Sequence, residues 1–424
     1  MEPPGAVLEE HAVAVRQGRI EAVLPLAEAA LRFPAHEQVA LGEHALIPGL
    51  VNAHTHAAMA LMRGLADDLP LMRWLEEHIW PAELRHVSPQ FVKDGTLLAC
   101  AEMLRGGVTC FNDMYFFPEA ALEAALEAGM RASIGIIVIE FPSAYASDPD
   151  DYLAKGLALR DRWRGHPLAS FCLAPHAPYT VSDATFRKVA TIAAEVNVPV
   201  HIHLHETEEE IARSLAEHGA RPLERLRRLG LLGPGLIAVH AVHLGADEIA
   251  LLAQHGASVA HCPSSNLKLA SGLAPVARML EAGINLSLGS DGAASNNRLD
   301  LFEEMRLAAL LAKAVARSAE AMPAHAALRA ATLGGAAALG LDGQIGSIVP
   351  GKSADLAAVR LAGPELEPCY NPVSHLVYAA GRQHVSDVWV AGQRLVRDGA
   401  LLNPGLSGLD TRSKLWQNAL KTRP

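Results

Sequence analysis

Three histidines in the segment 198–206, VPVHIHLHE, alternate with aliphatic residues, and a glutamate follows them. In an extended strand, alternate side chains point to the same face, so His201, His203 and His205 can all face one side of a sheet. Neutral imidazoles combined with a carboxylate are ligands that zinc and ferrous iron accept. The segment therefore predicts a metal site, with Glu206 at its edge.

Other short apolar segments of the chain also end in residues that ionise or bind metals. A single histidine at such an end is more often a hydrogen-bonded structural residue, and a single aspartate can cap the next helix. The joint pattern favours a shared site, because six of eight expected strands end in this way. The side chains at these ends, besides the segment above, are His54, His56, His176, His240, His261 and Asp291.

The elements that must position these side chains repeat as a strand followed by a helix. Eight near-continuous apolar runs alternate with alanine- and leucine-rich stretches, which indicates a parallel sheet covered on both faces. Eight such units predict a (β/α)₈ barrel. An open, doubly wound sheet is the alternative, but no GxGxxG turn follows the first strand. The expected strands are 49–54, 107–113, 132–140, 168–176, 198–206, 236–243, 256–263 and 284–291.

A barrel of this kind carries its active site at the carboxyl ends of the strands, so the polar ends should meet there. His203 is at the depth that suits a ligand, whereas His201 lies one pleat deeper and His205 is nearly out of the strand. Structural roles are expected for those two histidines. Strict alternation turns Glu206 away, but the chain can curl back as it enters the next helix. Alternatively, Glu206 is a glutamate of that helix's first turn, which Thr207 and Glu210 would open as a capping box.

Both ends of the chain differ from its middle. Residues 1–47 and 345–424 carry short strand signals with turns, and they predict a small β-sandwich domain into which the barrel of residues 48–344 is inserted. A helical stretch is expected in LDTRSKLWQNALK near the carboxyl end. Similar chains usually begin with an extra strand before GAVLEEHAVAV, whereas this one begins at MEPPG, so an edge strand of the sandwich is expected to be missing there.

Composition excludes several classes of partner. The formal charge of −10, from 36 basic and 46 acidic residues without a basic stripe, argues against nucleic acid and anionic membranes. Five cysteines without a CxxC pair argue against a disulfide framework. We see no signal peptide and no uninterrupted apolar stretch of about 20 residues, so we expect a cytoplasmic protein.

Several motifs together resemble the amidohydrolase superfamily, in the branch of the 5′-methylthioadenosine/S-adenosylhomocysteine deaminases. They are PGLVNAHTH, RGLADDLPLMRWLEEHIWPAE, HLHE, HAVHL, SSNLKLASG and GSDGAASNN. The similarity covers nearly the whole chain, and the ordered set is far more specific than HxH alone. It implies a distorted (β/α)₈ barrel with a small β-sandwich, and a homo-oligomer. It also implies one divalent metal ion, zinc or alternatively ferrous iron, held by His54, His56, His203 and Asp291.

The resemblance further implies hydrolytic deamination of an adenine nucleoside. A bound cation lowers the pKa of water toward neutrality, Glu206 gives a proton to N1 of the ring, and His240 and Asp291 take the proton of the water. Glu83 would bind the ribose hydroxyls, unless it is only a solvated helix residue. His176 would bond a purine nitrogen. Trp74 and Trp80 could roof the pocket, or one of them could belong to the core.

One departure from the family bears on the substrate. Members that accept S-adenosylhomocysteine bind its carboxylate with arginines between the third and fourth strands, but segment 135–156 has none. Arg131 precedes its strand and should lie at the opposite end of the barrel. We therefore expect a preference for methylthioadenosine, with weaker use of adenosine or S-adenosylhomocysteine. The rivals are a deaminase or chlorohydrolase acting on another purine, a pterin or a triazine, a nucleoside-binding protein, and an inactive barrel that serves as an assembly subunit.

Overall fold

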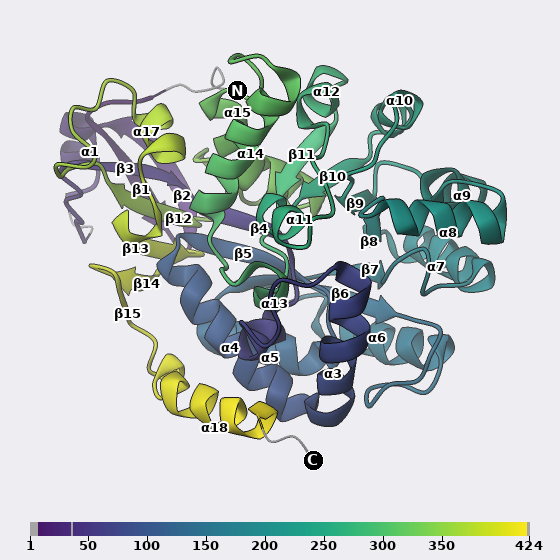
Figure 1. Cartoon of the computed structure of the whole chain (residues 1–424). Helices are drawn as coiled ribbons and strands as arrows, with labels where there is room; N and C mark the ends of the chain where they lie inside the picture. The colour runs from purple at the N-terminus through teal and green to yellow at the C-terminus, as the bar shows by residue number, and fades with distance from the viewer. Residues whose placement is uncertain (1–6, 35–36, 422–424) are drawn as a thin grey trace.

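Eight parallel strands form the central sheet of the protein (Figure 1). The computed structural model describes residues 7–34 and 37–421. Each strand pairs with the next one in the chain, as the barrel prediction requires and a doubly wound sheet does not. The strands are β4 (Leu50–Thr55), β5 (Val108–Asp113), β6 (Arg131–Val138), β7 (Ala169–Pro175), β8 (Val200–Leu204), β9 (Leu236–His240), β10 (Ser258–His261) and β11 (Asn285–Leu288).

The first and last strands of this sheet come together and nearly close it. The N–H of Asp291, just beyond β11, donates to the carbonyl oxygen of His54 in β4 at 3.0 Å. Sequence order and near closure confirm the distorted (β/α)₈ barrel. The approach also brings the two ends of the predicted site into one place.

Helices surround the barrel and follow its strands. Their ends match the expected signals at several places: α5 (Pro118–Ala128) ends at Gly129, and α8 (Glu208–His218) ends at Gly219, both glycines being left-handed. The other main helices are α4 (Pro89–Arg105), α6 (Pro149–Trp163), α7 (Asp183–Val196), α9 (Pro222–Arg228), α10 (Ala246–Gln254), α11 (Pro263–Lys268), α12 (Val276–Glu281) and α14 (Leu301–Ala316). Over the described residues, no helix has the length and apolar character to cross a membrane.

The capping box predicted for α8 is only half formed. The Thr207 hydroxyl accepts from the N–H of Glu210 at 3.2 Å, as expected. The Glu210 carboxylate does not return to Thr207, because it accepts from the N–H groups of His205 and Glu206 instead. The prediction was therefore wrong for the second half of the motif.

Segments from both ends of the chain build a small β-sandwich, as predicted. A hairpin of β1 (His11–Arg16) and β2 (Arg19–Pro25) faces a five-stranded sheet ordered β15-β14-β13-β12-β3. Ile20 packs with Leu356 and the partly buried Trp389. The sheet contains β3 (His44–Pro48), β12 (Leu356–Arg360), β13 (Val385–Val390), β14 (Gln393–Arg397) and β15 (Ala400–Leu401). The edge strand expected to be missing before residue 7 concerns residues outside the described part of the chain.

A buried ion pair joins the sandwich to the barrel. Arg131, at the start of β6, donates from Nε to the Asp355 carboxylate at 2.8 Å, and both side chains are almost fully buried. Asp355 immediately precedes β12 of the small sheet. Arg131 thus lies at the amino end of its strand, away from the polar rim, as its place in the sequence predicted.

The helix expected near the carboxyl end forms as α18 (Leu409–Lys421). In Figure 1 it is the yellow helix next to α4. The indole N–H of Trp416 donates to the Asp94 carboxylate in α4 at 3.0 Å, and the ring meets Phe91 edge-on. These contacts fix the end of the chain on the outer layer of the barrel.

Candidate metal centre and active site

Four side chains from three strand ends meet at the carboxyl rim of the barrel. The Nε2 atoms of His54 and His56 lie 3.2 and 3.4 Å from Oδ1 of Asp291. Nε2 of His203, from β8, lies 3.3 Å from Nε2 of His54. The end of β4, strand β8 and the loop after β11 therefore bring these side chains together around His54.

Donor atoms around His54 have the spacing that a divalent cation requires. Ligand atoms about 2.1 Å from a zinc ion, at tetrahedral angles, lie about 3.4 Å from one another. Three separations, 3.2, 3.3 and 3.4 Å, agree with that value. Among the described residues, the donor atoms that all lie within 4.8 Å of one another form two sets: His54 with His56 and Asp291, and His54 with His203 and His240. Three imidazoles and one carboxylate are also a donor set that zinc accepts.

Partners on the other ring nitrogen orient each histidine toward the centre. Every Nδ1 is engaged elsewhere, so each Nε2 is directed to the shared point, which is how metal-binding histidines are usually held. Nδ1 of His56 lies 2.5 Å from the carbonyl oxygen of Met114, and Nδ1 of His203 lies 2.8 Å from the carbonyl oxygen of His176. Nδ1 of His54 lies 3.2 Å from Nε2 of His201.

Electrostatics favours the protonation states that bind a metal. Burial lowers the pKa of His54 to about 4 and holds the pKa of His203 well below its ordinary value, so both rings are neutral at pH 7. Burial alone would raise the pKa of Asp291. The hydrogen bond with His54 and the electrostatic influence of the neighbouring imidazoles instead hold this pKa well below the ordinary value.

Glu206 and His240 form a second pair beside the four ligands. Oε2 of Glu206 lies 3.8 Å from Nε2 of His240, and both side chains are buried. Burial raises the pKa of Glu206. Burial opposes charge on His240 as well, but the carboxylates of Glu206 and Asp291 outweigh it and raise the pKa of His240. The pair can therefore hold and move protons beside these side chains.

A cavity of about 460 Å³ opens above this centre, a size that suits a small organic ligand. His56, His176, His203, Glu206, His240 and Asp291 line its polar part, together with Glu83. Aromatic and aliphatic side chains line the remainder, including Trp74, Trp80, Phe116, Phe117, Phe141 and Tyr145. No arginine or lysine is among the lining residues of the described chain.

Glu83 follows β4, the first strand of the barrel, and its side chain lines the cavity. Glu83 is therefore not simply a solvated helix residue. Glu83 lies in α3 (Trp80–His86) and accepts a hydrogen bond from the Tyr115 hydroxyl at 2.7 Å. Burial raises the pKa of Glu83 to about 7. Trp80 and Trp74 both line the cavity, and the Trp74 indole N–H donates to the Ala66 carbonyl oxygen at 3.1 Å.

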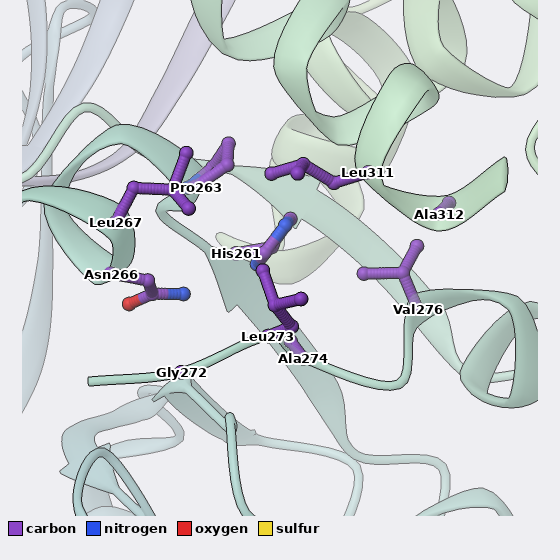
Figure 2. A pocket seen from close by; sticks show the side chains of 10 residues that line it. All are labelled: His261, Pro263, Asn266, Leu267, Gly272, Leu273, Ala274, Val276, Leu311 and Ala312. Carbon is purple, nitrogen blue, oxygen red and sulfur yellow. The ribbon is translucent and has the colours of Figure 1, made fainter. Parts of the chain in front are cut away.

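Two of the histidines at strand ends do not join the centre. The backbone of His205 is left-handed, with φ of 55°, so the chain has left the strand and the ring accepts from the N–H of Leu223 at 3.1 Å. His261 lines a separate small cavity of about 10 Å³, beside Asn266 and Leu311 (Figure 2). The expectation that His261 shares the polar rim was wrong.

Two residues that touch the centre were not singled out in the sequence. The Ser265 hydroxyl donates to Oδ2 of Asp291 at 2.6 Å, and the Asn266 amide oxygen lies 2.8 Å from Nδ1 of His240. Both belong to the motif SSNLKLASG and lie in helix α11, the first helix after strand β10. Polar residues at a strand end in a barrel are themselves a signal that could have identified them.

Comparisons with known proteins identify relatives of the whole chain. The model of the amidohydrolase family matches residues 45–395. The 5-methylthioadenosine/S-adenosylhomocysteine deaminase of Teredinibacter turnerae is 47% identical, over 99% of this chain and 95% of its own. The protein of the same name from Saccharophagus degradans is 48% identical, over 98% and 93%.

Solved structures show the same architecture. The crystal structure of an adenosine deaminase from Xanthomonas campestris with bound zinc has a TM-score of 0.98 at 52% identity and covers 99% of this chain and 96% of its own. The atrazine chlorohydrolase of Arthrobacter aurescens, complexed with zinc, has a TM-score of 0.89 at 25% identity, over 97% and 96%. The chain therefore belongs to the amidohydrolase family, whose fold it shares.

Proposed function

We propose that the protein is a metal-dependent deaminase that hydrolyses the bond between C6 and the amino group of 5′-methylthioadenosine. The products are the inosine analogue and ammonia. The observation that carries the proposal is the buried pair Glu206 and His240 beside four converging metal-ligand side chains, at the base of a nucleoside-sized cavity. The two deaminases that share 47% and 48% of this sequence support it.

His54, His56, His203 and Asp291 would hold one divalent ion, with zinc as the proposed metal and ferrous iron as the alternative. When bound, the ion supplies a water molecule whose pKa is lowered toward neutrality. Among the described residues, two sets of side chains have the spacing for a metal: His54 with His56 and Asp291, and His54 with His203 and His240. His54 belongs to both sets, which supports a single centre. The relative from Xanthomonas campestris holds zinc.

The protein's own side chains would move the protons. Glu206, whose pKa burial raises, holds a proton and donates it to N1 of the ring, which makes C6 more electrophilic. His240 and Asp291 orient the attacking water and accept its proton. The new C6–O bond forms, the C6–N bond breaks, and ammonia leaves with the protons collected by these side chains.

Two further side chains would hold the nucleoside. The Glu83 carboxylate accepts hydrogen bonds from the ribose hydroxyls, while the Tyr115 hydroxyl keeps it in place. His176, whose pKa burial lowers to about 3, is neutral and can bond a purine nitrogen. Its Nδ1 lies 3.0 Å from the Thr180 hydroxyl, which leaves Nε2 for the ligand.

The outer part of the cavity favours an apolar group on the 5′ carbon. Aromatic side chains line it, and no cation is among its described lining residues to pair with the carboxylate of S-adenosylhomocysteine. Glu140 cannot replace a cation there, because its side chain is itself a carboxylate, which accepts from the N–H of Ser182 at 2.9 Å. A lost charge-assisted hydrogen bond weakens affinity about 10- to 100-fold.

The experiment that tests this function is an ultraviolet assay of adenine-to-hypoxanthine conversion. Methylthioadenosine, adenosine and S-adenosylhomocysteine are compared at equal enzyme concentration. We expect kcat/KM to be highest for methylthioadenosine and at least about 10-fold lower for S-adenosylhomocysteine. Equal values would defeat the proposed preference. Chloride release from a chlorotriazine, or deamination of a pterin alone, would assign the site to another reaction.

We propose residues 48–344 as the catalytic domain, and residues 1–47 with 345–424 as the sandwich domain. We also propose a homo-oligomer in the cytoplasm. The five cysteines, all free in the structure, support a reducing compartment. Light scattering on the purified protein measures the oligomeric state directly.

A further inference from the structure

Just beyond strand β8, the side chain of Glu206 lies on the face of the sheet opposite to the one that strand alternation predicts. Glu206 is three residues beyond His203, so a continued strand would direct the two side chains to opposite faces. Both nevertheless line the same cavity. The backbone of His205 lies in the left-handed region, with φ of 55°, and this one residue redirects the chain.

The buried carboxylate of Glu210 stabilises the change of backbone direction at His205. Oε1 of Glu210 accepts from the N–H of His205 at 2.9 Å, and Oε2 accepts from the N–H of Glu206 at 2.8 Å. Glu210 is only 5% exposed, whereas Glu208 and Glu209 in the same helical turn are exposed. The two N–H groups have left the strand ladder, so they need this acceptor.

The loop after β9 also stabilises the backbone of His205. The carbonyl oxygen of His205 accepts from the N–H groups of Val242 and His243, each at 3.0 Å. The peptide groups around His205 are therefore bonded on both sides. Helix α8 has its own cap in the Thr207 hydroxyl, so Glu210 is not needed for that purpose.

We propose that Glu210 is a positioning residue, which sets the backbone of residues 205 and 206 so that the Glu206 carboxyl group points into the cavity. The proposal rests on the proposed function, because it gives Glu206 the proton-transfer role. Without the Glu210 carboxylate, two buried N–H groups lose their acceptor and the left-handed turn loses its support. A displacement of about 1 Å in a reacting group can cost about 100-fold in rate.

The test compares Glu210→Gln with Glu209→Gln, a matched change at an exposed position of the same turn. Glutamine keeps one oxygen but places an NH₂ group against a backbone N–H. We expect kcat for methylthioadenosine to fall about 10- to 100-fold in Glu210→Gln, with KM within about 3-fold and zinc content unchanged. Glu209→Gln should match the wild type. Equal kcat values in the two variants would overturn the proposal.

A double-mutant cycle separates positioning from general damage to the fold. If Glu210 acts through Glu206, adding Glu210→Gln to Glu206→Gln lowers kcat no further. The same loss in both backgrounds would overturn the proposal. If Glu210→Gln does not give folded protein by circular dichroism, Glu210→Asp replaces it in the cycle. That variant keeps the charge on a shorter side chain, and the same two outcomes apply.

A crystal structure of the zinc-loaded Glu210→Gln variant gives a result that does not depend on the substrate. We expect the Glu206 carboxyl group to move by about 1 Å or more from its place beside His240. An unmoved Glu206 would overturn the inference. If the wild type fails to deaminate methylthioadenosine but Glu206 moves in the variant, the proposed function falls and the positioning role stands.

Discussion

Glu206 and Asp291 are two carboxyl groups in one cavity, and their surroundings separate their pKa values. Burial raises the pKa of Glu206, while the imidazoles of His54 and His56 help to hold the pKa of Asp291 well below its ordinary value. One group can therefore carry a proton while the other stays ionised, which is how a single site performs both acid and base steps.

This division predicts the behaviour of Glu206→Gln. The amide cannot deliver a proton to the ring, so we expect kcat to fall about 100- to 10,000-fold. Zinc content should stay unchanged, because Glu206 is not one of the four proposed ligands. Steady-state kinetics and metal analysis of the same sample check both statements. Full activity in this variant would remove Glu206 from the mechanism.

Sequence patterns predicted some residues of the site correctly and left others ambiguous. His54, His203 and Asp291 could be assigned to one site, because each lies at the end of an apolar run and the ends of parallel strands lie at the same edge of a sheet. His261 also ends such a run, but its neighbours Ala260 and Cys262 are both small and apolar, so the pattern does not tell which face is inside. His205 was ambiguous because alternation fails at the residue where φ becomes positive.

Helix α14 joins two loops of the rim through one buried carboxylate. Glu304 accepts from the N–H of Ser264 at 3.1 Å and from the Asn296 side chain at 2.8 Å. Burial raises the pKa of Glu304 from its ordinary 4.5 to about 8. The folded protein therefore keeps a proton that the unfolded chain releases between these two pH values.

The raised pKa of Glu304 predicts how stability depends on pH. Its contribution is fully present below pH 4.5 and is lost as pH rises through about 8, because only the folded state binds the proton in between. Relative to Glu304→Gln, the wild-type free energy of unfolding should fall by up to about 1.4 kcal/mol per pH unit in this window. Urea unfolding of both proteins at pH 5.5, 6.5 and 7.5 measures the difference. Parallel pH profiles would show that Glu304 does not titrate there.

The ion pair between β6 and the small sheet predicts a change in stability without a change in chemistry. Arg131→Met leaves the buried Asp355 carboxylate unpaired, so the free energy of unfolding should fall by about 3–5 kcal/mol. The double variant Arg131→Met/Asp355→Leu should recover part of this loss. At a temperature where Arg131→Met remains folded, kcat should stay near the wild-type value. An unchanged denaturation midpoint would show that the pair does not hold the two parts together.

In the whole molecule, the site joins the two edges of the barrel sheet. His54 comes from β4, the first strand, and Asp291 follows β11, the last, while His203 comes from the middle of the series. The order of strands was predictable because each apolar run has a helix after it. The hydrogen-bond partners of the Glu210 carboxylate were not predictable, because the spacing of residues does not reveal which of several nearby N–H groups a carboxylate reaches.

The most direct test of the account is a zinc titration of metal-free protein, followed by the rate of methylthioadenosine deamination. A chelator removes the metal, and zinc is then added back in steps below and above the protein concentration. We predict that the rate rises linearly and becomes constant at one zinc ion per chain, with His203→Ala remaining inactive at the same additions. A rate that is independent of zinc, or that needs two ions per chain, would contradict the central claim.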